Sequence, residues 1–286
     1  MNFINVIKKV FICFLLTHIQ VAAFSQSYFL EENVNWLKDE AKYEKAYMHG
    51  EIGKIKDDLM IYLEASESLE KNFKNFHFFD YNFDGYIDII YSGDAGTESK
   101  RTLIFEPNEN GYSKTFDKYG ALISLYPLTR IGQPLSLVLK EQICCGGFSI
   151  VYEIYQPIFD NGKLELKPST KYSFIVGTEL PDSFYDAPIL FEVQNEKYLL
   201  RLNPMIDNQI ENEELHIVGN VIAEYTVGSK GYAIAENQEN SDRIWWFVIM
   251  INNNPPSKSI FDTGSNNKNH YYSIGWMSNR YLKQIK

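Results

Sequence analysis

The residues best suited to chemistry form a run of oxygen-bearing side chains in the first half of the chain. Residues 80–88 read DYNFDGYID, with oxygen donors at loop positions 1, 3, 5 and 9 and glycine at position 6. The donors are the side chains of Asp80, Asn82, Asp84 and Asp88, and the carbonyl of Tyr86 would supply position 7. Calcium collects six to eight oxygens, and the glycine permits the sharp turn that such a loop needs. We therefore predict a Ca²⁺ site with a structural role.

The residues around this loop indicate strands. Position 12 is Tyr91 and not the glutamate of an EF-hand, so flanking helices are not required. With aromatic and β-branched runs on both sides, the stretch resembles the calcium loops of FG-GAP/VCBS repeats, which join strands in integrin-type propellers. The resemblance covers about 20 residues, in one copy, and implies a hairpin tied by calcium. The alternative is an Asx-rich turn that binds no ion.

Two adjacent cysteines form a second candidate feature. Cys144 and Cys145 precede a pair of glycines. In an oxidising compartment they would normally pair, although adjacent residues pair only through a strained ring, because ordinary bridges join Cα atoms about 5.5–6 Å apart. A vicinal disulfide and a pair of buried or free thiols both stay open. Catalytic thiol exchange would favour Cys-x-x-Cys, which the sequence lacks.

No catalytic signature is present in the sequence. It contains no H-E-x-x-H, G-x-S-x-G or G-x-x-x-x-G-K-[ST] motif. His77 lies between phenylalanines in a predicted strand, where an ordinary sheet histidine is expected. We therefore predict no catalytic residue and expect a protein that is not an enzyme.

The last 70 residues hold four aromatic and β-branched runs, at 221–225, 231–236, 245–250 and 274–283. A Trp-Trp-Phe-Val strand followed by Gly-Trp-Met-x-x-x-Tyr-Leu-Lys resembles the bacterial SH3-like (SH3b) domain over about residues 215–286. The resemblance implies that Trp246, Trp276 and Tyr281 line a groove for a cell-wall peptide or another protein. The polar insertion at 252–269 departs from the usual compact form. Alternatively, the tryptophans serve mainly the core, since a small barrel needs buried aromatics.

The elements that must position these residues are mostly strands. Apolar residues recur at three and four between 31 and 73, which predicts helices. Later, short β-branched and aromatic runs alternate with turn residues. We predict a mainly β fold with N-terminal helices, an α+β class, in which a β-sheet domain precedes a small SH3-like β-barrel. The expected bounds are a signal peptide at 1–25, a helical segment at 26–75, the β-rich domain at 76–212 and the SH3-like domain at 213–286.

The N-terminus predicts export. Lys8 and Lys9 precede an apolar stretch that ends in small residues near Ala23 and Ser25, as in a secretory signal peptide. An uncleaved anchor is the alternative, although the apolar run is shorter than the roughly 20 residues of a membrane span. Cleavage would leave 25 Lys and Arg against 37 Asp and Glu. We expect a periplasmic or extracellular protein without a later membrane span, and its acidity argues against a nucleic-acid partner.

Two functions follow from these observations. The first is an exported, non-catalytic binding protein of the bacterial envelope that recognises a cell-wall component or an envelope protein. A narrower version is an inhibitor of a lytic enzyme, since an acidic surface suits basic partners. The second is a cell-wall hydrolase whose SH3-like part targets a catalytic domain. That reading would require His77, Cys144 and an acid to converge.

Overall fold

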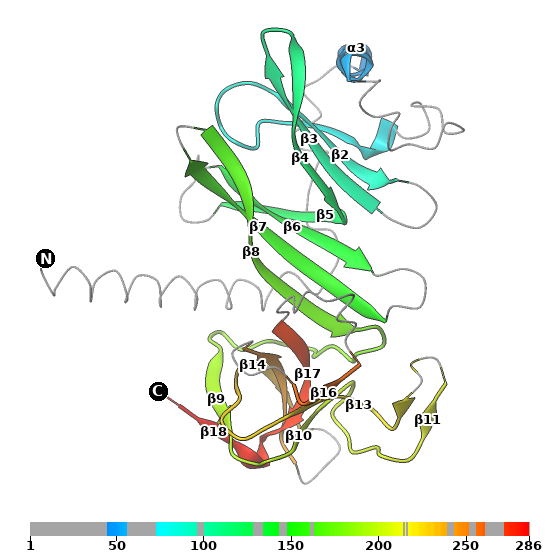
Figure 1. Cartoon of the computed structure of the whole chain (residues 1–286), viewed down its shortest axis with the longest axis vertical. Coiled ribbons are helices and arrows are strands. Elements are labelled where there is room, and N and C mark those ends of the chain that lie inside the picture. Colours follow the sequence, from blue (N-terminus) through cyan, green and yellow to red (C-terminus); the bar gives the residue numbers. More distant parts are fainter. Residues whose placement is uncertain are drawn as a thin grey trace, which may run out of the picture. The chain divides into compact units, whose positions relative to one another are not determined.

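The computed structural model describes residues 45–55, 73–95, 100–127, 134–142, 148–160, 163–213, 215, 217–238, 243–251, 256–260 and 272–285. They form two compact units, one within Glu32–Lys171 and one within Tyr172–Lys286. Strands dominate both units, and the described α-helix is α3, Lys45–Lys54 (Figure 1). A mainly β fold is thus confirmed. The predicted signal peptide and most of the predicted helical segment lie outside the described residues.

The first sheet of the N-terminal unit has four antiparallel strands in the order β1-β2-β3-β4. Side chains of a strand point alternately to the two faces. Accordingly Ile89 and Tyr91 share a core with Ile52 of α3, whereas Ile90 belongs to a separate core on the opposite face. The sheet is therefore covered on both faces. The bounds are η1 Phe73–Asn75, β1 Phe76–Phe79, β2 Asp88–Asp94, β3 Lys100–Asn108 and β4 Gly111–Tyr119.

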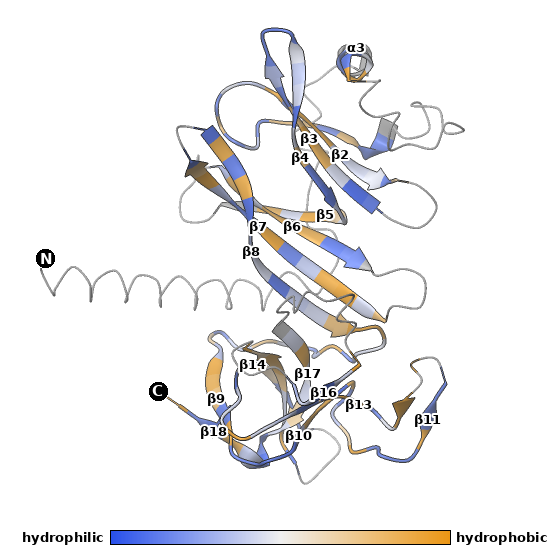
Figure 2. Ribbon diagram, viewed as in Figure 1, coloured by the Kyte–Doolittle hydropathy of each residue, from blue (hydrophilic) through white to orange (hydrophobic). Residues whose placement is uncertain are grey.

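A second sheet covers the face that carries Ile90. Leu137 of this second sheet packs with Ile104 of the first, and the ring of Phe116 meets that of Tyr155 edge-on at 4.9 Å. Hydrophobic residues lie mainly in the first part of β6 and polar residues at its end (Figure 2), and successive residues from Leu135 to Leu139 are buried. The strands are β5 Ala121–Pro127, β6 Leu135–Gln142, β7 Ser149–Asp160 and β8 Lys163–Ile175.

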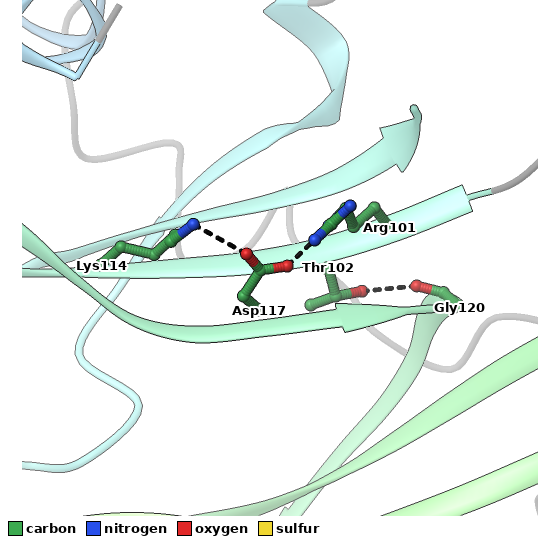
Figure 3. A network of polar contacts seen from close by, with 5 residues as sticks. All are labelled: Arg101, Thr102, Lys114, Asp117 and Gly120. Carbon is green, nitrogen blue, oxygen red and sulfur yellow. Dashed lines mark hydrogen bonds and ion pairs between the residues drawn. The ribbon is translucent and has the colours of Figure 1, made fainter. Parts of the chain in front are cut away.

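The chain passes from the first sheet to the second at Gly120. Its φ of +114° favours glycine, and a Cβ there would lie 3.3 Å from a backbone oxygen of β6. The carbonyl of Gly120 accepts a hydrogen bond from the hydroxyl of Thr102 at 2.8 Å (Figure 3). Nearby, Asp117 of β4 accepts from Arg101 at 2.6 Å and from Lys114 at 2.7 Å. These contacts fix the end of β4 against β3.

The C-terminal unit contains an antiparallel sheet in which β18, β9, β14, β15 and β17 are successive neighbours. Strand β10 pairs with β17 and β13, and β16 pairs with β13. The described strands form no closed barrel. The bounds are β9 Ile189–Val193, β10 Tyr198–Arg201, β11 Glu211–Asn212, β12 Ile217–Val218, β13 Val221–Tyr225, β14 Lys230–Asn237, β15 Trp245–Met250, β16 Lys258–Ser259, β17 Tyr272–Ser278, η2 Asn279–Tyr281 and β18 Leu282–Gln284.

The two units meet in sequence between Lys171 and Tyr172, well before the predicted boundary at 212/213. The reason is strand pairing over long sequence separations. Strand β9 pairs with β14, and β10 pairs with β13 and β17. Strands β9 and β10, which the predicted bounds place in the first β domain, therefore belong to the sheet of the C-terminal unit.

Candidate functional site

The predicted calcium loop joins β1 to β2 and has an ordered internal hydrogen-bond pattern. Asp80 accepts from the backbone N–H of Asp84 at 3.1 Å and of Gly85 at 3.0 Å. Asp84 in turn accepts from the backbone N–H of Tyr86 at 2.8 Å. Gly85 has a φ of +91°, which explains the glycine at loop position 6. The spacing of the motif thus produces a tight loop whose first and fifth positions bind its own backbone.

Asp88, at loop position 9, is a carboxylate inside the protein. It is 0% exposed. One oxygen, Oδ2, accepts from the backbone N–H of Tyr81 at 3.1 Å, whereas Oδ1 has no hydrogen-bond partner. The pKa of Asp88 is raised to about 8, mainly by burial; the Tyr81 N–H lowers this pKa, and the negative charges of Glu106, Asp84 and Asp80 add to the rise. A nearby positive charge would stabilise this carboxylate.

The donor set fits a hard cation in part. Asp80, Asn82, Asp84 and Asp88 supply oxygens, and the unpartnered Oδ1 of Asp88 is the kind of atom that a calcium ion would satisfy. However, the described residues contain no group of three or more acidic, histidine or cysteine side chains that converge as metal ligands. Ion binding would therefore require the loop carboxylates to turn toward Asp88. The calcium site stays a prediction.

The three aromatic residues predicted to line one groove lie in different environments. Trp276 is 0% exposed, its ring lies 5.1 Å from that of Phe247, and its indole N–H donates to the carbonyl of Glu179 at 2.7 Å. It is a core residue, which argues against its predicted place in a groove. Trp246 is half-buried beside Phe191 on β9. By contrast Tyr281 is 53% exposed.

Tyr281 borders a pocket of about 150 Å³ in the C-terminal unit. Its ring meets that of Tyr198 edge-on at 5.9 Å. Leu199 and Ile206 add apolar surface to the lining, and three cationic side chains also line it: Lys197, Arg201 and Arg243. The pocket therefore combines aromatic and aliphatic surface with positive charge. None of the three cationic residues was predicted as a site residue.

Arg201 is the most constrained residue of this pocket. It is 5% exposed and lies at a β-bulge, where the pairing of β10 with β13 shifts register. Its Nη1 donates to the side-chain oxygen of Asn220 at 2.6 Å and to the carbonyl of Asp207 at 3.0 Å, and its Nη2 donates to the side-chain oxygen of Asn208 at 3.0 Å. Burial lowers the pKa of Arg201, and the charge of Arg243 lowers it further. None of these three acceptors is a carboxylate.

The remaining candidates carry no site in the described part of the chain. Cys144 and Cys145 lie outside the described residues, so neither a vicinal disulfide nor the convergence of Cys144 with His77 is tested. His77 is buried in β1 between Phe76 and Phe78, as expected for a sheet histidine.

Comparison of the chain with known protein families, curated proteins and solved structures finds no match. Within the described segments, no helix combines the length and the apolar character that a membrane span requires. We therefore infer the function from the geometry of the loop and of the pocket.

Proposed function

We propose that this chain is an exported, non-catalytic binding protein of the bacterial envelope, stabilised by calcium, which recognises a cell-wall component or an envelope protein. The observation that carries the proposal is the pocket beside Tyr281 in the C-terminal unit. An exposed tyrosine beside a concave surface is typical of recognition sites, because its ring offers a large contact area and a hydroxyl.

The dimensions of the pocket favour recognition of one group on a larger molecule. About 150 Å³ is less than the roughly 300–1,000 Å³ of sites that enclose a whole small molecule. Exposed apolar residues at the pocket edge extend the contact surface: the lining residue Ile206 is 48% exposed, and its neighbour in sequence, Met205, is 52% exposed. A peptide or protein could thus place one residue in the pocket and contact the surrounding surface.

Calcium would have a structural part in this function. The loop from Asp80 to Asp88 lies in the N-terminal unit, whereas the pocket lies in the C-terminal unit. The ion would neutralise the buried Asp88 and so stabilise the hairpin of β1 and β2. In the C-terminal unit, the strand pattern and the resemblance support an SH3-like module as part of the proposal.

Affinity capture from envelope extract tests the proposed function. The protein is immobilised in calcium and exposed separately to purified sacculi and to soluble envelope proteins. Tyr281→Ala should reduce capture about tenfold or more if the pocket carries recognition. Tyr119→Ala is the matched control, since Tyr119 is also 53% exposed but lies in the N-terminal unit. Equal capture by the two variants would contradict the proposal. If the immobilised protein retained sacculi but no soluble envelope protein, the version in which it inhibits a lytic enzyme would be excluded.

A further inference from the structure

Arg201 is a buried guanidinium that has no ion-pair partner among the described residues. The three acceptors of Arg201 are two side-chain amide oxygens and one backbone carbonyl. Arginine stays protonated in proteins and has five N–H donors. These three hydrogen bonds therefore do not use all of its donors, and their neutral acceptors do not neutralise its positive charge. A buried charge without a counter-charge is costly. Such a residue is suited to pairing with an anion from outside the chain.

The surroundings of Arg201 add positive charge. Arg243 lies close enough to lower the pKa of Arg201 through charge repulsion, and Lys197 lines the same pocket. The described residues that line the pocket include no aspartate or glutamate. The charge of Asp207 favours the protonated form of Arg201, but its Oδ1 accepts from the backbone N–H groups of Gln209 and Ile210 at 2.9 and 3.0 Å. The pocket is thus locally basic in a chain whose formal net charge is -10.

A neutral donor in the pocket also lacks an acceptor. Trp245 lines the pocket and is 3% exposed, and its indole N–H has no hydrogen-bond partner in the described part of the chain. Buried polar groups in native proteins are almost always hydrogen-bonded, so an unpartnered donor requires an explanation. An anionic ligand with oxygen atoms would supply a counter-charge to Arg201, and one of its oxygens could also serve as the acceptor of Trp245.

We infer that this pocket binds the free carboxylate at the end of a peptide chain, with Arg201 and Arg243 facing the carboxylate and with Tyr198 and Tyr281 contacting the terminal residue. The inference rests on the proposed binding function and specifies its ligand. A guanidinium pairs with the two oxygens of a carboxylate through two parallel hydrogen bonds. The volume of about 150 Å³ suits one small residue. The apolar surface of Leu199 and Ile206 favours a carboxylate attached to carbon over a bare inorganic anion.

Calorimetry with a matched pair of small peptides tests the inference. The purified protein is titrated with N-acetyl-alanyl-alanine and with the same peptide as its C-terminal amide. The acid should bind at least about tenfold more tightly, because charge-assisted hydrogen bonds are lost with the amide. Its affinity should also fall as salt is added. Equal affinity of acid and amide would overturn the inference, as would inorganic phosphate that binds as tightly as the acid.

Substitutions assign the effect to the pocket. Arg243→Gln should weaken binding of the acid about tenfold and leave the weak binding of the amide unchanged. Arg280→Gln is the matched control, since Arg280 is exposed and does not line the pocket. Arg201→Gln should abolish the preference for the acid, and its melting temperature is measured alongside because the side chain is buried. A full preference for the acid in both pocket variants would contradict the assignment.

Two further arms separate the sources of the carboxylate and the two proposals. Peptides of D-alanine represent wall peptides, and peptides of L-alanine represent protein chain ends, so a preference for either form identifies the source.

If Tyr281→Ala abolishes envelope capture while acid and amide bind equally, the proposed function stands and the carboxylate inference fails. If the acid binds selectively but envelope capture does not depend on Tyr281, the proposed function fails and the pocket is still an anion site.

Discussion

Among the described residues, the N-terminal unit buries Asp88 and the C-terminal unit buries Arg201, two ionisable side chains of opposite sign in different environments. Asp88 is 0% exposed and Arg201 is 5% exposed. Asp88 receives one backbone hydrogen bond and keeps an unpartnered oxygen, whereas Arg201 donates three hydrogen bonds to neutral oxygens. A carboxyl group can escape the cost of burial by taking up a proton, but a guanidinium cannot lose its proton. The fold therefore has to supply hydrogen-bond acceptors to Arg201. The charge state of Asp88, by contrast, can depend on pH or on a bound cation.

This difference also separates the roles of the two sites. An ion bound near Asp88 would change the stability of the N-terminal unit, because it would hold the carboxylate in its charged form. An anion bound near Arg201 would act on recognition, because the protein already solvates the guanidinium with its own oxygens. The predictions below test this contrast.

The largest effect should be a loss of stability as the chelated protein is taken from acid to pH 8. The pKa of Asp88 is raised to about 8 in the folded protein, so its contribution to stability is complete below its unfolded pKa of 3.8 and is lost as pH rises toward 8. The difference is on the order of 5 kcal/mol, since each pKa unit corresponds to about 1.4 kcal/mol. Asp88→Asn should lack this component, and urea unfolding in EDTA at several pH values measures it. Parallel pH profiles for the two proteins would contradict the burial of a titrating carboxyl.

Arg201→Met should destabilise the C-terminal unit by about 3 kcal/mol, because it leaves the buried side-chain oxygen of Asn220 without its donor and removes two further hydrogen bonds. Urea unfolding without peptide measures the change. Arg280→Met is the control and should stay within about 0.5 kcal/mol of the parent, as expected for an exposed position. A more stable Arg201→Met protein would mean that the three hydrogen bonds do not offset the burial of the charge.

Calcium should raise the melting temperature of the parent protein, and Asp84→Ala should abolish the rise. Saturation at about 100 times Kd corresponds to about 2.7 kcal/mol of added stability. Asp117→Ala is a suitable control, since this aspartate lies on β4 and pairs with Arg101 and Lys114. Its calcium-dependent rise should equal that of the parent. If the parent shows neither a thermal shift nor heat of binding with calcium, the loop is an Asx-rich turn.

The loop was accessible to prediction because its information is local. Spacing alone indicated the positions of Asp80, Asp84 and Gly85, and the structure places them in one tight loop between two strands. The complete burial of Asp88 was not predictable in the same way. It depends on Tyr81, which belongs to the core between the two sheets, and therefore on residues distant in sequence.

The pocket was missed because it is assembled from several separate segments. Arg201, Arg243 and Tyr281 come from the end of β10, the residues before β15 and the turn after β17. One signal was available, since Arg201 interrupts the apolar run from Tyr198 to Leu202. A charged residue at a strand end is common, however, and the sequence does not show that a bulge places it in the interior. Pairing between distant strands also explains why the compact units divide between Lys171 and Tyr172, whereas the domain boundary at 212/213 stays a prediction.

The smallest predicted effect separates two buried tryptophans that differ in one hydrogen bond. Trp276 donates its indole N–H to Glu179, whereas the indole N–H of Trp245 has no partner in the described residues. Replacement by phenylalanine creates a similar loss of volume at both sites, so the difference between the two variants isolates the hydrogen bond. Trp276→Phe should cost about 1 kcal/mol more than Trp245→Phe in urea unfolding without ligand. Saturating N-acetyl-alanyl-alanine should reduce or reverse this difference, because it stabilises the parent and Trp276→Phe more than Trp245→Phe, which lacks the donor. Equal costs in both conditions would mean that the N–H of Trp245 already has an acceptor and that the pocket does not need an external one.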